Sequence, residues 1–460
     1  MRAHALAAAA GMIAGALGVH AADAIKPGEL VHERPSAQCI HFVWLVRGDT
    51  NRSAKVEVEG RKVGGAAWTP CQAMARSSED EWEGVHTLSI AVAGLDPASE
   101  YELRLRMKDR DGVEGEAERT VKVRTAKLHV YEPQWPKHST DYSNREPVLR
   151  IGDGDTVQTK SWMWNFLNGP FFVEGAEPGD ALAVRLERVE PEGQGASGGA
   201  LVRWAVDPAT AKELPESQGG ASWAVDLQPG TATVKGVTVP QRVGEKWEET
   251  KADTPAVGLR VPLRPMIGDM GVAVDAPPGK APHMVDCGRH GGNLDWNGVR
   301  AGVTMYYPVF VKGGLYYLSD GHAAQGAGEP LMMGIEIGMK VQFTAWVVKG
   351  KKIAFPRGED AEHIYAVGVG VDENDGTRQF ELARQHATAE MFRWLREDYG
   401  LDVHQASILM GMCGDYEIGS IVGRRTVVHK MPKKLLRAFG SPYGGALHPA
   451  PSQAKGSGEK

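Results

Sequence analysis

The sequence contains few cysteines, no excess of basic residues and no long apolar run. Its four cysteines include no C-x-x-C pair, which disfavours a thiolate zinc site. The net charge of −6 disfavours binding to a phosphate backbone, so no nucleic-acid partner is expected. No segment approaches the roughly 18 consecutive apolar residues of a membrane-spanning helix. At 42% hydrophobic and 24% charged residues, the composition is that of an ordinary soluble globular protein.

Several catalytic signatures are also missing. The sequence has no phosphate-binding P-loop, no dinucleotide fingerprint between a strand and a helix, and no H-E-x-x-H zinc motif. Its 460 residues allow two or three domains. Its 57 glycines and 27 prolines, together with few long helical patterns, favour strands and turns. The sequence therefore predicts a mainly β protein of more than one domain.

Residues 1–21 differ from the rest of the chain. They have a basic start at Arg2, a core of small apolar residues and the cleavage-like triplet VHA at 19–21. This pattern predicts a secretory signal peptide, and hence an exported protein, periplasmic or secreted, with no stable membrane span after cleavage. A short amphipathic helix or a retained anchor is the alternative.

The pattern of residues 28–127 predicts an all-β sandwich, because short runs alternate with period 2 between Gly, Asp and Pro turns. The stretch GLDPASEYELRLR (94–106) resembles the tyrosine corner of fibronectin type III domains, in which the phenol of a residue such as Tyr101 contacts nearby backbone. Such a domain is expected to serve as a spacer, packing partner or adhesion module. Cys39 and Cys71 are its plausible disulfide pair, and two buried free thiols are the alternative.

Two helices interrupt the strand pattern further along. Apolar residues at helical spacing predict a helix within 375–400, capped at its start by Asp375 or Thr377. The stretch DVHQASILMGMCG follows as a second, more buried helix, with Asp402 and Gln405 in capping-box spacing. The apolar stripes on these helices are expected to pack in the core.

The rest of the chain after 127 is predicted as one mainly β domain, 128–445, that ends in this helical segment. Within it, the Gly/Ser/Ala-rich residues 192–222 predict a surface insertion or flexible loop. The tail 446–460 is expected to be disordered.

Three stretches combine metal-capable side chains with glycines: CGRHGGNLDWNG (287–298), SDGHAAQGAGE (319–329) and PKHSTDYSN (136–144). A strand end at D-G-H would send Asp320 and His322 to the same side, so both could reach one ion. Carboxylate and imidazole donors suit zinc, whereas a set of oxygens would suit calcium. Each stretch alone is more typical of a Gly-rich turn, but the three together favour a site.

The three stretches belong to a longer collinear pattern that resembles the acetamidase/formamidase family. Six motifs of that family appear in order across 130–432: HSTDYSNREPVLRIGDGDTV (138–157), GPFFVEGAEPGD (169–180), MIGDMGVAV (266–274), HGGNLD (290–295), SDGHAAQGAGE (319–329) and CGDYEIGSIV (413–422). The resemblance implies a β-sandwich-based fold, a divalent metal, zinc in preference to calcium, and often a dimer, here a homodimer. It also implies hydrolysis of a short aliphatic amide, such as formamide or acetamide, to carboxylate and ammonia.

The resemblance further implies which residues form the site. The positions that match the family's polar motif residues are expected to hold the metal through His138, Asp295, Asp320 and His322. The expected catalytic residues are Glu329, Asn293 and Glu174. A carboxylate such as Glu329 could move the proton of the attacking water to the leaving amine, and Asn293 could orient the amide. These roles are hypotheses within the resemblance.

Some positions depart from the family pattern and put the substrate in question. Ala327 stands where an aspartate is common, and Asp269 introduces a charge beside an apolar turn. The aromatic pairs at 171–172 and 306–307 are expected in the core rather than in the pocket. The alternatives are a non-catalytic exported protein that binds a metal or ligand on the same fold, and, on the N-terminal domain alone, an adhesion protein.

Overall fold

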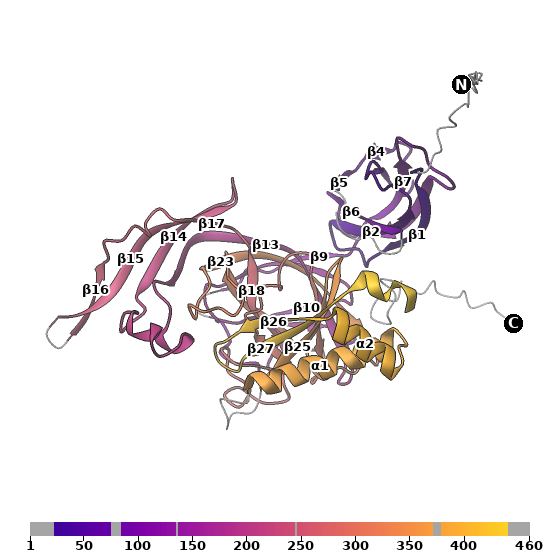
Figure 1. The fold of residues 1–460 in the computed structure, drawn as a ribbon. Coiled ribbons are helices and arrows are strands. Elements are labelled where there is room, and N and C mark those ends of the chain that lie inside the picture. Colours follow the sequence, from indigo (N-terminus) through magenta and orange to yellow (C-terminus); the bar gives the residue numbers. More distant parts are fainter. Residues whose placement is uncertain (1–22, 75–83, 135–136, 244–245, 371–378, 440–460) are drawn as a thin grey trace, which may run out of the picture.

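The computed structural model describes residues 23–74, 84–134, 137–243, 246–370 and 379–439 (Figure 1). The predicted signal peptide, the predicted disordered tail and the expected helix caps Asp375 and Thr377 lie outside these ranges. Within them the protein is mainly β, as predicted, with two small sheets near the N-terminus, one large sheet and two α-helices. Figure 1 shows the two small sheets at one end of the large sheet and a long ribbon of strands at the other.

The N-terminal sheets enclose a core of their own. One has the order β1 (Lys26–His32), β2 (Cys39–Arg47), β6 (Val85–Ala93), β5 (Gln72–Met74); the other has β4 (Thr69–Pro70), β3 (Lys55–Lys62), β7 (Glu100–Lys108), β8 (Glu118–Arg124). Every second residue of β7 is buried, since successive side chains of a strand point to opposite faces. The backbone N–H of Asp96 donates to the hydroxyl of Tyr101 at 3.0 Å, which is the phenol contact expected from the sequence. The likeness to a fibronectin type III domain stays a prediction.

All four cysteines are free in the structure. Cys39 and Cys71 are both half-buried, and the ring of His41 lies 3.5 Å from the sulfur of Cys39. Of the two alternatives that the sequence leaves open, the structure shows free thiols, which are half-buried rather than fully buried as expected.

The large sheet forms the body of the second domain. Its central strands are buried on both faces, as in β22, where every residue is buried. Tyr316 and Leu318 of this strand pack into the main apolar cluster, and Tyr317 packs into a separate one. Its strands are β9 (Leu128–Val130), β10 (Leu149–Ile151), β11 (Thr156–Ser161), β12 (Asn168–Val173), β13 (Ala181–Gly198), β14 (Gly220–Asp226), β15 (Thr231–Val243), β16 (Lys246–Lys251), β17 (Arg260–Pro262), β18 (Met266–Val272), β19 (Cys287–Gly288), β20 (Gly291–Asn293), β21 (Thr304–Pro308), β22 (Tyr316–His322), β23 (Glu336–Val348), β24 (Arg357–Glu359), β25 (His363–Val369), β26 (Asp415–Ser420) and β27 (Thr426–Pro432).

The loop prediction for residues 192–222 is wrong at both ends. β13 continues to Gly198, where it pairs with β14, and β14 begins at Gly220. Between them lie two short 3-10 turns, η1 (Arg203–Ala205) and η2 (Thr210–Lys212). β14, β15 and β16 extend this pairing into the ribbon at the left of Figure 1, because cross-strand hydrogen bonds override the weak strand propensity of glycine and serine.

The two predicted helices are present. α1 (Gln379–Asp398) buries its apolar face against β25 and β27, with Met391 and Trp394 in the core, as expected. α2 (Val403–Cys413) has the predicted capping box between Asp402 and Gln405. The prediction that α2 is more buried is wrong, because only Ala406 is fully buried. α2 lies against α1 along one side and turns the rest of its apolar surface to solvent.

The N-terminal sandwich packs against the large sheet through polar contacts. The backbone N–H of Ala37 donates to Oγ1 of Thr156 at 2.8 Å, and Glu33 forms an ion pair with the buried Arg185 of β13. At the other end of the chain, η3 (Lys433–Phe439) contributes Arg437, which donates to the carbonyl of Val85. These contacts join the sandwich to the second domain, and which of the roles expected from its sequence it serves stays a prediction.

A buried ion pair joins α1 to the sheet and gives a stability prediction. Arg357 and Glu390 are both buried, with Nε of Arg357 2.7 Å from Oε1 of Glu390. Glu390→Ala is expected to lower the free energy of unfolding by about 3–5 kcal/mol, because it leaves the guanidinium buried and under-compensated. Urea denaturation measures this change. The exposed pair Arg384–Glu381 on the same helix supplies the control, since Glu381→Ala should lower the free energy of unfolding far less, and equal losses would contradict the prediction.

Candidate metal centre and active site

The centre of the site is the C-terminal end of β22. This strand pairs with β12 and β18 and, at its last residue, with β23. Asp320 and His322 are almost completely buried there, and Nε2 of His322 lies 3.4 Å from Oδ2 of Asp320. The two side chains meet on the same side of the strand, as the sequence predicts.

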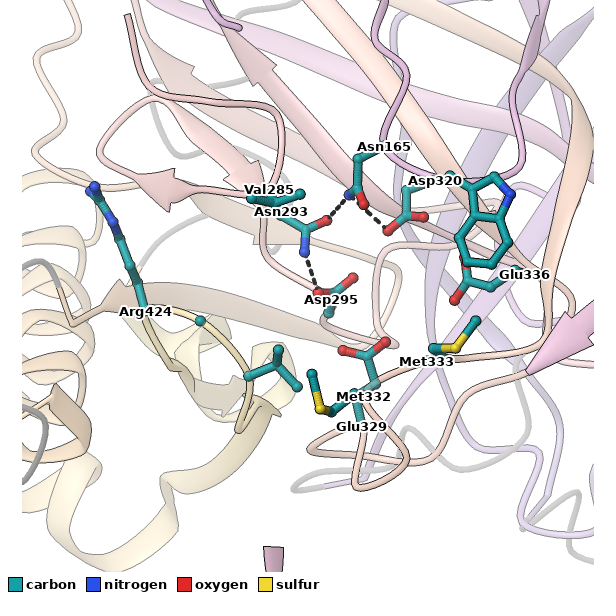
Figure 2. A pocket seen from close by; sticks show the side chains of 13 residues that line it. Asn165, Val285, Asn293, Asp295, Asp320, Glu329, Met332, Met333, Glu336 and Arg424 are labelled. Carbon is teal, nitrogen blue, oxygen red and sulfur yellow. Dashed lines mark hydrogen bonds between the residues drawn. The ribbon is translucent and has the colours of Figure 1, made fainter. Parts of the chain in front are cut away.

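Two further elements complete the predicted cluster. β18 pairs with both β22 and β20, and this arrangement carries Asn293 and Asp295 to the end of β22. The amide of Asn293 donates to Oδ2 of Asp295 at 2.6 Å. Glu329 lies in the loop between β22 and β23 and is buried. These residues and Asp320 line a cavity of about 260 Å³, shown in Figure 2.

The structure adds two residues that the sequence analysis missed. Glu336, the first residue of β23, pairs directly opposite His322, and its Oε1 lies 3.0 Å from Nε2 of His322. Asn165 donates from its amide both to Asn293 and, at 3.2 Å, to Asp320 (Figure 2). The signal for Glu336 was its place at the start of an apolar strand just after the Gly-rich loop. Asn165 gives no local signal.

Hydrogen bonds fix which ring nitrogen of His322 faces the carboxylates. The amide nitrogen of Gln325 donates to the carbonyl of Asp295 at 2.6 Å, so its oxygen, Oε1, must be the atom beside Nδ1 of His322. An acceptor at Nδ1 places the proton there. In the neutral ring Nε2 therefore presents a lone pair toward Asp320 and Glu336, the arrangement in which histidine binds metals.

The side chains form two overlapping groups that could hold a cation. Asp295, His322 and Glu329 have ligand atoms within 4.8 Å of one another, and so do Asp320, His322 and Glu336. Three buried atoms of these residues have no hydrogen-bond partner: Nε2 of His322, Oδ1 of Asp295 and Oε2 of Glu336. The His322–Glu336 distance suits an ion pair without the geometry of a hydrogen bond. Because buried polar atoms are normally paired, these residues fit a divalent metal.

The charges of the cluster also favour a cation. Burial raises the pKa of both Glu329 and Glu336 to about 7. Burial and the neighbouring Glu329 raise the pKa of Asp295 well above its ordinary value. Burial opposes ionisation of Asp320 and His322 as well. The attraction of His322 outweighs burial and lowers the pKa of Asp320, and the attraction of Glu336 and then Asp320 raises the pKa of His322. The raised pKa values mean that these carboxyl groups resist ionising together, and a divalent ion among them would favour their charged forms.

The backbone of the site is strained. Among the described residues, ten that are not glycine have a positive φ, and five of them line the cavity. L-residues rarely adopt this conformation, and its cost of about 1–3 kcal/mol each is found mostly at functional sites. The five residues are Trp164, Asp295, Asp320, Glu329 and Met332.

The loop that carries Glu329 is anchored to a distant strand. The backbone N–H of Gly328 donates to the carbonyls of Ile418 and Gly419 at 3.1 Å, and Ile421 donates back to the carbonyl of Gly328 at 3.0 Å. β26 therefore holds in place Gly328, the residue that precedes Glu329.

Two predicted site residues lie apart from the cluster. The ring of His138 is half-buried against Phe166, with 4.6 Å between ring centroids, and it does not line the cavity. Glu174 lies just after β12 at the surface, with 55% of its side chain exposed, and pairs with Arg150 at 3.1 Å. The structure thus brings together five of the seven predicted residues.

The structure shows where the residues that depart from the family pattern lie. Ala327 is exposed and does not line the cavity, so an aspartate there would not join the cluster. Asp269 is fully buried in β18 and accepts a hydrogen bond from Tyr142, and burial raises its pKa well above the ordinary value. The aromatic pairs at 171–172 and 306–307 are buried in the core, as expected.

One serine stands in a sequence with the spacing of a nucleophile elbow. GASGG at 195–199 fits G-x-S-x-G, but Ser197 lies inside β13 rather than at a strand-to-helix turn. Its hydroxyl accepts from the indole of Trp223 at 2.9 Å and donates to the carbonyl of Gly198. Because Ser197 is buried within the strand, its hydroxyl is not exposed as a nucleophile would be.

Comparisons with known proteins agree with the resemblance. The model of the Acetamidase/Formamidase family matches residues 220–433. An acetamidase from Mycolicibacterium smegmatis is 27% identical over 296 residues, which make up 54% of this chain and 72% of that protein. A predicted acetamidase/formamidase from Thermoanaerobacter tengcongensis superposes with a TM-score of 0.53 at 24% identity, covering 68% of this chain and 98% of that one. An acetamidase from Bacillus halodurans gives a TM-score of 0.53 at 23% identity, covering 68% of this chain and 100% of that one.

The two solved structures show that the β-rich fold is shared. The family match and the sequence relative support the predicted likeness to the acetamidase/formamidase family, and the class of protein is that of an amide-hydrolysing enzyme. Neither of the two α-helices in the described ranges is long and apolar enough to cross a membrane.

Proposed function

We propose that the protein is an exported, metal-dependent amidase that hydrolyses a small amide to a carboxylate and ammonia. The observation that carries this proposal is the meeting of His322 with four buried carboxyl groups at a cavity, where three of the ligand atoms have no hydrogen-bond partner. The family resemblance supports the same reaction. Export rests on the signal-like residues 1–21, and a homodimer rests on the resemblance alone.

The metal would be held by Nε2 of His322 together with carboxylates from one or both groups. The imidazole donor favours zinc over calcium, which prefers a set of oxygens. A divalent ion there would polarise the amide carbonyl and lower the pKa of a water beside it. Gln325 would keep the imidazole in the tautomer that binds metal, because its Oε1 accepts from Nδ1.

The remaining residues would act on the substrate and on the proton. Glu329 would take a proton from the attacking water as the water oxygen bonds to the amide carbon. It would then give the proton to the amide nitrogen as the C–N bond breaks, which releases ammonia and leaves a carboxylic acid that ionises to the carboxylate and passes its proton to solvent or to ammonia. Both ends of the Asn293 amide are occupied, by Asn165 and Asp295, so Asn293 would position the carboxylate of Asp295 rather than hold the substrate.

Chelation tests the metal and the reaction together. Metal analysis of the purified protein is expected to find bound divalent metal, and ammonia release from formamide, acetamide and propionamide should follow it. Removing the metal with a chelator should abolish ammonia release, and zinc should restore it better than calcium. Full activity in protein shown to be metal-free would contradict the proposal.

A non-catalytic binding protein is the second candidate, because the same donor atoms would hold a structural ion. It predicts metal-loaded protein that melts at a higher temperature than metal-free protein but releases no ammonia from any amide. Ammonia release by the loaded protein excludes it.

A further inference from the structure

The mouth of the cavity is apolar, in contrast to its floor. Five large apolar side chains line it beside the carboxyl groups, and Figure 2 labels three of them, Val285, Met332 and Met333, around the polar centre. Val285 is 51% exposed, Trp164 42% and Met332 40%. Large apolar side chains that stay exposed next to one another mark binding surfaces. The five are Trp164, Val285, Met332, Met333 and Val422.

Two of these side chains are held in place at a conformational cost. Trp164 and Met332 have φ values of 73° and 59°, a region that bulky residues rarely occupy. The carbonyl of Trp164 accepts hydrogen bonds from the hydroxyl of Ser319 at 2.7 Å and from the backbone N–H of Asp320 at 3.2 Å. The strand that carries the site therefore also fixes the backbone that carries the indole. Neither side chain is buried in the core, so core packing does not account for this strain.

The size of the cavity exceeds the needs of the smallest amides. At about 30 Å³ for each water-sized group, acetamide would fill roughly half of the 260 Å³ available. The remaining space lies against a lining in which the polar residues are the acidic cluster, its two asparagines and Arg424. Arg424 already contacts Asp286 at 3.4 Å, and an anionic substituent would meet the carboxyl groups.

We propose that this mouth is the acyl-binding subsite of the enzyme and selects primary amides with an uncharged, apolar acyl chain longer than that of acetamide. The inference rests on the proposed amidase function and names its substrate class. The carboxamide lies at the acidic cluster, and the hydrocarbon chain lies between Trp164 on one side and Met332 and Met333 on another.

A series of straight-chain primary amides from acetamide to hexanamide tests the subsite. In the metal-loaded full chain, kcat/KM for ammonia release is expected to rise by about two- to fourfold for each added methylene. Trp164→Ala and Met332→Ala should each reduce the ratio of kcat/KM for hexanamide to that for acetamide by about tenfold. Circular dichroism checks whether each variant is folded. If the Trp164→Ala protein is not folded, Met332→Ala provides the test.

The neighbouring cavity supplies a matched control. It measures about 320 Å³, is also lined by Glu329 and Met333, and has Trp223 in its wall. Trp223→Ala should leave the chain-length ratio at the wild-type value. A ratio lowered by Trp223→Ala but not by Trp164→Ala would overturn the proposal by placing the acyl chain in the other cavity.

Calorimetry separates this inference from the proposed function. Affinities of the same amides for the His322→Ala protein, in which turnover is expected to be lost, should rise with chain length. Rising affinity without ammonia release from the wild type would support the subsite and reject the amidase. The subsite proposal would be overturned if kcat/KM for ammonia release did not rise with chain length. It would also be overturned if the affinities for the His322→Ala protein did not rise with chain length.

Discussion

His322→Ala is expected to lower kcat/KM for ammonia release by more than about a hundredfold and to remove the bound metal. Even outer partners of metal ligands cost about 10- to 100-fold when they are removed, and His322 belongs to both candidate ligand groups. Metal analysis and initial rates on the same preparation measure the two effects. The variant measures the contribution of the imidazole alone, because the carboxyl groups of the cluster remain.

His404→Ala is the control for this variant. His404 is exposed in the first turn of α2, so its removal should change neither the metal content nor the rate. A His322→Ala protein that keeps its metal and the wild-type rate would show that the site assignment is wrong, even if the protein is an amidase.

Glu329→Gln is expected to lower kcat by about 10²- to 10⁴-fold while the bound metal remains. This loss is the range for removing a positioned general base, and the glutamine keeps the size of the side chain in the buried loop. The ratio of metal to protein distinguishes the two roles that the geometry allows for Glu329. Loss of metal together with activity would make it a ligand instead of the proton carrier.

Glu174→Gln is the matched control, since both residues were predicted to be catalytic. Glu174 is exposed, is paired with Arg150 at the surface and does not line the cavity. Its substitution should leave kcat within about twofold, as expected for an exposed ion pair. A loss as large as that of Glu329→Gln would return Glu174 to the site.

Much of the fold follows from local patterns. Alternation predicts strands such as β7, and helical spacing predicts α1, because each pattern reports one buried face. The local pattern fails where pairing with strands distant in the sequence determines whether a segment forms a strand. The glycine-rich end of β13 is typical of a loop by composition, yet its register with β23 and β14 makes it a strand. α2 is apolar in sequence but stands at the surface, which its own sequence does not reveal.

Some residues of the site could likewise be predicted from the sequence and others could not. Asp320 and His322 are found from the sequence because two residues separated by one lie on the same side of a strand. Glu336 reaches His322 through the pairing of β22 with β23, and Asn165 arrives from a segment more than a hundred residues earlier in the chain. Glu174 belongs to a motif whose polar residue sits in a surface turn, so motif membership alone could not exclude it.

The anchoring of the Glu329 loop has a consequence for how the active protein arises. Gly328 is held by Ile418 and Gly419 of β26, which follows both helices in the chain. A growing chain that already contains β22 has Asp320 and His322 but not yet the strand that fixes Glu329. The proposed role of Glu329 therefore depends on residues that are synthesised after α1 and α2. A fragment released before that point could hold an ion without acting on an amide.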